Sequence, residues 1–262
     1  MLFASAFTKL QAMKTNRVVI KLGTNAITNE DATLNQALLQ TLSKQIADIT
    51  RDSDVLIISS GAVAAGRSLI SDKKYDDVTN KQIYAAVGQA QLMKLYTHLF
   101  FEHEKVIAQV LGTKADFINR THYLNMKNCL ETLFKENIIP ILNENDVVAT
   151  EELMFTDNDE LAGLISKMLN PNFLIILSNV DGVYDAEGNV IPEFCHDEEM
   201  PKSIAEGSKS SFGRGGMHSK FKIAIETAKN GTQVYIANSK EPNVISRILA
   251  GENVGTRFLA RK

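Results

Sequence analysis

The chain has 262 residues, of which 44% are hydrophobic and 23% are charged, and its formal net charge is -3. This length suits one large α/β domain or at most two lobes, and the slightly acidic balance argues against a partner such as nucleic acid. The longest apolar runs have the length of a strand, so no membrane span is predicted. Cys129 and Cys195 lie far apart in no metal-binding spacing, which indicates free thiols in a reducing, cytoplasmic compartment.

Residues 1–15 precede the first predicted strand. They carry no basic segment before their apolar residues, so they make a poor signal peptide. Met13 stands just before the strand, and two interpretations stay open: a flexible native extension, or a start assigned too early. We therefore expect the folded domain to span residues 16–262.

Short apolar runs alternate with amphipathic segments along the rest of the chain. The segment 185–212 is polar and predicts a hairpin and a flexible loop over the site. The alternation predicts βαβ units in one compact α/β domain, a three-layer α/β/α sandwich with a mainly parallel central sheet. Strands are expected at 17–22, 54–59, 105–111, 138–142, 173–177, 232–237 and 255–259; helices are expected at 34–49, from 60, at 79–103 and 123–135, from 159, from 220 to 230, and at 243–249.

Two polar clusters lie ten residues apart around the fourth strand. Residues 143–146, Asn-Glu-Asn-Asp, follow the apolar run 138–142, and residues 157–159, Asp-Asn-Asp, precede a helix. In open α/β sheets, ligands bind outside the carboxyl ends of the strands. Either cluster alone is equally typical of turns and helix N-caps. The two together favour a site for a small polar ligand.

A lysine interrupts the first apolar strand. Burying the ammonium group of Lys21 is costly unless it reaches a site or a partner. It could contact the terminal phosphate of a nucleotide as a point charge, although a place on an edge strand would also explain it.

Two glycine-rich turns open helices. At residues 59–62, Ser-Ser-Gly-Ala, backbone N–H groups could bind an anion, or the small residues could serve close helix packing. Residues 213–220, Gly-Arg-Gly-Gly-Met-His-Ser-Lys, differ from the Walker spacing but could cradle a phosphate with Lys220, unless that lysine lies on a solvated face. The histidines, His218 included, form no catalytic or metal-binding set. Two lysines, two such turns and a carboxylate cluster suit phosphoryl transfer.

Taken together, these motifs resemble the amino-acid kinase superfamily, and within it the glutamate 5-kinase branch, over nearly all of residues 16–260. The Asn-Glu-Asn-Asp and Asp-Asn-Asp pair is the feature most specific to this branch. Three positions differ from the usual pattern, at Thr156, Asn179 and Arg214, and they leave nucleotide preference open. The further matching motifs are Lys-Leu-Gly-Thr at 21–24, Ser-Ser-Gly-Ala-Val-Ala-Ala-Gly at 59–66, Ala-Ala-Val-Gly-Gln at 85–89, and the segments 178–184 and 215–220.

The resemblance implies the amino-acid kinase fold and ATP-dependent phosphorylation of the γ-carboxylate of L-glutamate to L-glutamyl 5-phosphate, the first step towards proline. It implies Mg²⁺ on the ATP phosphates with few or no protein ligands. It also implies a glutamate side up to about residue 170 and a nucleotide side from about 171, and a homo-oligomer, either a dimer or a tetramer. Glutamyl phosphate reductase is an expected partner, and proline inhibition would involve residues 87–89. Many members continue into a PUA domain, whose properties are not carried over to this sequence.

The resemblance also implies a role for each matching residue. Lys21 and Lys220 would stabilise charge on the transferred phosphoryl group, and Asp159 would orient both. No general base is expected, because a glutamate carboxyl, with a pKa of about 4.3, is already ionised at neutral pH. The substrate contacts would be Ser60 and Gly61 for the transferred group and glutamate, and Asp146 and Asn158 for the α-amino and α-carboxylate ends. The nucleotide contacts would be Ser178, Asn179, Arg214, Gly215, Gly216, Met217, His218 and Ser219, together with the two lysines.

Two other hypotheses remain open at this point. The chain could be another amino-acid kinase, with acetylglutamate, aspartate, carbamate or UMP as its acceptor. It could also be a non-catalytic, nucleotide-binding regulatory module on the same fold, which the residues Asn179 and Arg214 would motivate.

Overall fold

The computed structural model describes residues 14, 16–70, 75–149, 155, 157–201, 204 and 216–261. Most of the predicted extension, residues 1–15, lies outside the described residues. The same is true of Thr156, Arg214 and Gly215, and of residues 202, 203 and 205–212 within the predicted hairpin and loop at 185–212.

An eight-stranded sheet forms the centre of the described structure, in the order β3-β4-β2-β1-β5-β7-β8-β6. Neighbours from β3 to β7 pair in parallel, whereas β8 runs antiparallel to β7 and β6 pairs in parallel with β8. The predicted mainly parallel sheet is therefore confirmed. The strands are β1 (Asn16–Leu22), β2 (Ser53–Ser59), β3 (Ile107–Gly112), β4 (Ile139–Glu144), β5 (Phe173–Ser178), β6 (Glu193–Phe194), β7 (Gln233–Asn238) and β8 (Thr256–Phe258).

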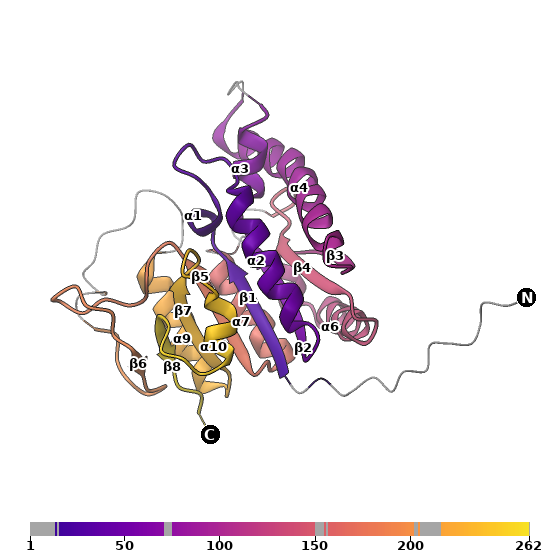
Figure 1. Cartoon of the computed structure of the whole chain (residues 1–262). Coiled ribbons are helices and arrows are strands. Elements are labelled where there is room, and N and C mark those ends of the chain that lie inside the picture. The colour runs from indigo at the N-terminus through magenta and orange to yellow at the C-terminus, as the bar shows by residue number, and fades with distance from the viewer. Residues whose placement is uncertain are drawn as a thin grey trace, which may run out of the picture.

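Helices cover both faces of the sheet and complete the predicted three layers (Figure 1). One hydrophobic cluster joins one face to α2, α4 and α10, and a second joins the other face to α6, α7 and α9. The helices are α1 (Thr24–Ile27), α2 (Gln36–Ile49), α3 (Ala62–Arg67), α4 (Asp77–Phe101), α5 (Lys114–Ile118), α6 (Arg120–Lys135), α7 (Asn158–Leu169), α9 (Met217–Lys229) and α10 (Val244–Leu249). In the described part of the chain, no helix has the length and apolar character that crossing a membrane requires.

The central strand β1 decides which face Lys21 occupies. Side chains alternate along a strand, and Val18, Ile20 and Leu22 all belong to the cluster with α2 and α4. Val19 belongs to the opposite cluster, with α7 and α9. Lys21 therefore points to the face covered by α7 and α9.

The sequence prediction missed two short helices. Helices α1 and α5 have 4 and 5 residues, which is too short for a 3.6-residue periodicity to develop. The hairpin expected after residue 185 is present as an antiparallel bridge between Tyr184 and Val190, followed by the two-residue strand β6.

Helices α3 and α4 approach each other closely at two glycines. A Cβ atom at Gly66 would overlap the carbonyl oxygen of Tyr84, and one at Gly88 would overlap the carbonyl oxygen of Ala62. The small residues after β2 thus do serve close packing, as one of the two interpretations of that motif proposed. The contact holds the start of α3 against α4.

We predict that Gly88→Ala lowers the free energy of unfolding by about 1–2 kcal/mol, because an overpacking cost of up to about 3 kcal/mol outweighs the roughly 1 kcal/mol that alanine gains in a helix. Urea denaturation measures the change. The control is Gln91→Ala on the exposed face of the same helix, which should stay within about 0.5 kcal/mol of the wild type. Equal stability of Gly88→Ala and the control would contradict the close packing.

Candidate active site

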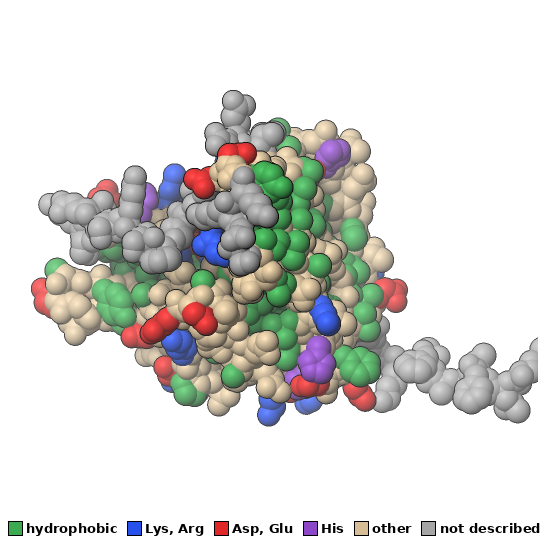
Figure 2. All heavy atoms as spheres, turned by 90° about the horizontal axis from the view of Figure 1, so that it is seen from above, with side chains coloured by type: hydrophobic (Ala, Val, Ile, Leu, Met, Phe, Trp, Pro, Cys, Tyr) green, Lys and Arg blue, Asp and Glu red, His purple; other side chains and the backbone are tan. Residues whose placement is uncertain are grey.

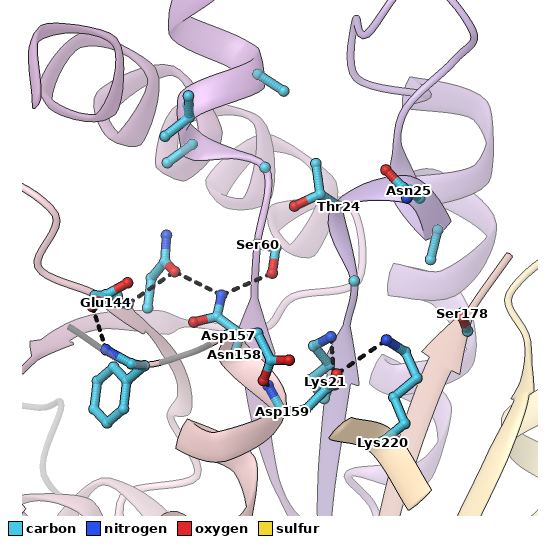
Figure 3. Close-up of a pocket in the computed structure, with 18 of the residues that line it drawn as sticks. Lys21, Thr24, Asn25, Ser60, Glu144, Asp157, Asn158, Asp159, Ser178 and Lys220 are labelled. Carbon is cyan, nitrogen blue, oxygen red and sulfur yellow. Dashed lines mark hydrogen bonds and ion pairs between the residues drawn. The ribbon is translucent and has the colours of Figure 1, made fainter. Parts of the chain in front are cut away.

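A cavity of about 440 Å³ opens where β1, β2, β4 and β5 end (Figure 3). Most of the described residues that were predicted to form the site line this cavity, although they come from distant parts of the sequence. Seen from above, hydrophobic side chains form a broad band beside acidic and basic ones (Figure 2). The predicted residues in the lining are Lys21, Ser60, Gly61, Asp146, Asn158, Asp159, Ser178, Asn179, Gly216, Met217 and Lys220.

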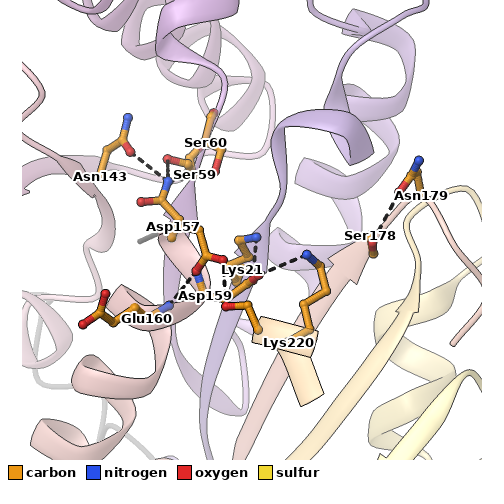
Figure 4. A network of polar contacts seen from close by, with 12 residues as sticks. Lys21, Ser59, Ser60, Asn143, Asp157, Asp159, Glu160, Ser178, Asn179 and Lys220 are labelled. Atoms are coloured by element: carbon orange, nitrogen blue, oxygen red, sulfur yellow. Dashed lines mark hydrogen bonds and ion pairs between the residues drawn. The ribbon is translucent and has the colours of Figure 1, made fainter. Parts of the chain in front are cut away.

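A buried carboxylate joins the two predicted catalytic lysines. The Oδ1 atom of Asp159 lies 2.6 Å from Nζ of Lys21, and its Oδ2 atom lies 3.0 Å from Nζ of Lys220 (Figure 4). The Asp159 side chain is 0% exposed. Three elements supply these three side chains: β1 carries Lys21, α7 carries Asp159 and α9 carries Lys220.

The two ammonium groups determine the charge of this carboxyl. Burial by itself raises the pKa of Asp159, but the positive charges of Lys21 and Lys220 outweigh it and hold the pKa below its ordinary value of 3.8. Asp159 is therefore a carboxylate at neutral pH.

Asp157 fixes the starts of both helices that carry these groups. Its Oδ1 atom caps α7 by accepting hydrogen bonds from the backbone N–H groups of Asp159 and Glu160, at 2.8 and 3.0 Å. Its Oδ2 atom accepts a hydrogen bond from Oγ of Ser219 on α9, at 2.8 Å. Ser219, which was predicted to contact the nucleotide, thus contacts α7. His218 is exposed and lies outside the described cavity lining.

An amide network links the polar clusters that the sequence places ten residues apart. Nδ2 of Asn158 donates to the backbone oxygen of Ser59 at 3.2 Å, to Oγ of Ser60 at 2.8 Å and to Oδ1 of Asn143 at 3.0 Å. Asn143 in turn donates to Oε1 of Gln89 at 2.9 Å. The hydrogens of the Asn158 amide are thus directed at acceptors within the protein.

Glycines leave room where a ligand would approach the backbone. Gly61, the N-cap of α3, has φ 98, in the left-handed region that favours glycine. A Cβ atom at Gly23 would lie 3.3 Å from Nζ of Lys21, so glycine there leaves that ammonium unobstructed. Gly216, at the start of α9, has open space where a side chain would stand.

Comparison with known proteins agrees with this arrangement. The sequence pattern of the amino acid kinase family matches residues 16–238. Glutamate 5-kinases of Bacteroides thetaiotaomicron and Chlorobaculum tepidum are each 45% identical to the chain, over 93% and 94% of its length and 70% of their own. The chain belongs to the amino acid kinase family, in its glutamate 5-kinase branch.

One further relative and one solved structure are similar to the chain. The glutamate 5-kinase of Clostridium perfringens is 37% identical over 94% of the chain and 96% of its own length. A crystal structure of T. acidophilum isopentenyl phosphate kinase superposes with a TM-score of 0.65, covering 93% of this chain and 100% of the other at 15% identity. That likeness shows the shared amino acid kinase fold.

One charged residue of the cavity was absent from the sequence prediction. Nζ of Lys81, on α4, lies 2.6 Å from Oδ1 of Asp146. Lys81 stands in a polar stretch near the start of a long helix, where a lysine is ordinary, so no sequence pattern singles it out. Glu144 was predicted only as part of its cluster, and its Oε1 atom accepts a hydrogen bond from the backbone N–H of Phe155 at 2.9 Å.

We predict that Asp159→Asn lowers the free energy of unfolding by about 3–5 kcal/mol at neutral pH, because it leaves two buried ammonium groups without a counter-charge. Chemical denaturation measures the loss. Asp48→Asn, at an exposed position of α2, serves as the control and should change stability little. A loss no larger than that of the control would contradict the buried ion pairs.

The wild type and Asp159→Asn also give a prediction for the pH dependence of stability. The pKa of Asp159 is lowered in the folded protein, so its stabilising contribution is complete above the unfolded pKa of about 3.9. The contribution is lost as the pH falls from there through the folded pKa. The difference in unfolding free energy between wild type and Asp159→Asn should therefore be constant from neutral pH to about 5 and shrink below about 4. A constant difference down to acidic pH would contradict this assignment.

Proposed function

We propose that this chain transfers the γ-phosphoryl group of ATP to the γ-carboxylate of L-glutamate, giving L-glutamyl 5-phosphate for proline biosynthesis. The observation that carries the proposal is the pair of lysines held at one buried carboxylate in the cavity. The 45% identity to two glutamate 5-kinases supports the choice of glutamate as the acceptor.

The chemistry requires charge stabilisation more than proton transfer. A carboxylate oxygen of glutamate attacks the γ-phosphorus of ATP, and the bond from that phosphorus to the bridging oxygen of ADP breaks. No proton moves, so no general base is required. The difficulty is bringing one anion to another, and preorganised ammonium groups at the transferred phosphoryl group lower that barrier. Lys21 and Lys220 take this role, and Asp159 holds both in place.

The charges of the cavity make Mg²⁺ a fitting companion of ATP. The described lining contains three lysines and four carboxylates, which leaves the phosphate charge of ATP largely unbalanced. Mg²⁺ bound to the phosphates supplies that neutralisation. Among the lining carboxylates, Asp157 lies two residues before Asp159 at the start of α7 and would hold water ligands of the ion.

The remaining residues divide between the two substrates. Ser178, Asn179, Gly216 and Met217 line the cavity and would contact the nucleotide, as would Arg214 and Gly215, which lie outside the described residues. Ser60, Gly61, Asp146 and Asn158 line the cavity from the part of the chain before residue 170 and would contact glutamate. The homo-oligomeric state, the reductase partner and the cytoplasmic location remain predictions from the family resemblance.

A substrate panel tests the proposed function. ADP release is measured with ATP, Mg²⁺ and one of L-glutamate, N-acetyl-L-glutamate, L-aspartate, carbamate or UMP. Hydroxylamine present in the assay traps an acyl phosphate as a hydroxamate. We expect ADP release with L-glutamate, accompanied by an equal amount of hydroxamate. Turnover of another acceptor with none of glutamate would contradict the proposal, and nucleotide binding without any turnover would favour a regulatory module.

We predict that Lys220→Ala lowers kcat by about 10²–10³, because a preorganised charge at the transferred group is lost. The matched control is Lys222→Ala, an exposed lysine two residues along the same helix, whose kcat should equal that of the wild type. Lys220→Arg keeps the charge beside Asp159 and should melt at the wild-type temperature. A wild-type rate for Lys220→Ala would contradict the assigned role.

A further inference from the structure

A second ion pair lines the same cavity, separate from the lysine pair at Asp159. Lys81 on α4 and Asp146 after β4 face each other at 2.6 Å, and their side chains are 28% and 11% exposed. The pair is partly desolvated but open to a ligand in the cavity. None of the roles assigned above uses Lys81.

The turn that carries Asp146 is held to α4 at two successive residues. Beside the Lys81 pair, Nε2 of Gln82 donates to the backbone oxygen of Val147 at 2.9 Å. Gln82 and Val147 lie outside the described lining of the cavity. The turn thus has one charged link inside the cavity and one uncharged link outside it.

A carboxylate entering the cavity needs a donor that the protein has not already used. The hydrogens of the Asn158 amide are directed at protein acceptors, and Oγ of Ser60 is one of these acceptors. Lys21 and Lys220 are engaged with Asp159 and, under the proposed function, with the phosphoryl group. Lys81 is the remaining lysine of the described lining; it donates to Asp146, and because an ammonium group carries three hydrogens it can donate to a ligand as well.

Beyond the Asp146 and Asn158 contacts that the family resemblance implies, we propose that Lys81 completes the recognition of the zwitterionic head of the acceptor amino acid. Lys81 binds the α-carboxylate, and Asp146 binds the α-ammonium group. The inference rests on the proposed function and deepens it, because it assigns the residues that determine which carboxylic acids are accepted.

Charge balance makes this arrangement selective. The ion pair and the zwitterionic head are each neutral overall, so four alternating charges meet without burying a net charge. A ligand with only one of the two head charges leaves either Lys81 or Asp146 without a partner, which costs affinity. The pair therefore favours a free α-amino acid over an N-acylated or decarboxylated analogue.

Two analogues of glutamate separate the two charges. 4-Aminobutyrate keeps the reacting carboxylate and the amine but lacks the α-carboxylate, and glutarate keeps both carboxylates but lacks the amine. Titration calorimetry gives the dissociation constants of all three ligands for the wild type, Lys81→Met and Gln82→Ala. Gln82→Ala is the matched control, because it removes the uncharged link to the same turn.

The expected pattern is specific to the α-carboxylate. Lys81→Met should raise the dissociation constant of L-glutamate by roughly 100-fold, the size typical for losing one partner of a buried charge pair. The dissociation constant of 4-aminobutyrate should stay unchanged or fall. Gln82→Ala should bind all three ligands as the wild type does. Lys81→Arg, which retains the charge, should restore the preference for L-glutamate over 4-aminobutyrate and guards against a folding defect in Lys81→Met.

Two results would overturn the inference. If Lys81→Met weakens the binding of L-glutamate and of 4-aminobutyrate equally, Lys81 only holds the turn. The same conclusion follows if Gln82→Ala weakens the binding of L-glutamate as strongly as Lys81→Met does and leaves 4-aminobutyrate unchanged. Failure of the proposed function is a different result, since the wild type would then release no ADP with L-glutamate whatever the behaviour of its variants.

Discussion

The carboxylate of Asp159 between two ammonium groups is the interaction on which the rest of this structure depends. An unpaired carboxylate at 0% exposure would cost several kcal/mol, so the fold must bring both lysines to it. This requirement joins the central strand β1 to α7 and α9, whose residues lie far apart in the sequence. The same constraint holds two positive charges at the carboxyl ends of the strands. Under the proposed function, the same three side chains would meet both a stability requirement and a catalytic requirement.

The rest of the cavity extends this use of paired charges. Asp157 connects the starts of α7 and α9, and the Asn158 amide connects the end of β2 to Asn143 on β4. Lys81 and Asp146 add a second, more exposed pair at the turn after β4. Under the proposed function, the lysines at Asp159 would serve the transferred phosphoryl group, and Lys81 with Asp146 would serve the head of the acceptor.

Much of this site could be predicted because several residues stand out from their surroundings. Lys21 is a charged residue in an apolar strand. Asp146 follows an apolar strand, and Asn158 and Asp159 open an apolar helix; both places hold more polar residues than a turn requires. Lys81 could not be found this way, since a lysine in the polar opening segment of a helix is ordinary. Its meaning depends on a contact 65 residues away.

The fold, too, could be predicted only in part. Runs of β-branched and apolar residues gave the strands of the parallel sheet, and their alternation with amphipathic segments gave the three layers. The strand order and the reversed direction of β6 and β8 depend on long-range pairing that no local pattern encodes. The hydrogen bond from Ser219 to Asp157, the N-cap of α7, could not be predicted for a related reason, since it joins two segments 62 residues apart; the nucleotide contact of Ser219 stays a prediction.

The most direct test of the central claim is a crystal structure with Mg²⁺, a non-hydrolysable ATP analogue and L-glutamate bound together. The account predicts that Nζ of Lys21 and of Lys220 both remain in contact with Asp159 and both reach the oxygens around the γ-phosphorus, with the glutamate γ-carboxylate in line for attack. A complex in which either ammonium group has left Asp159 for open solvent, or in which the γ-phosphate binds away from both, would contradict it.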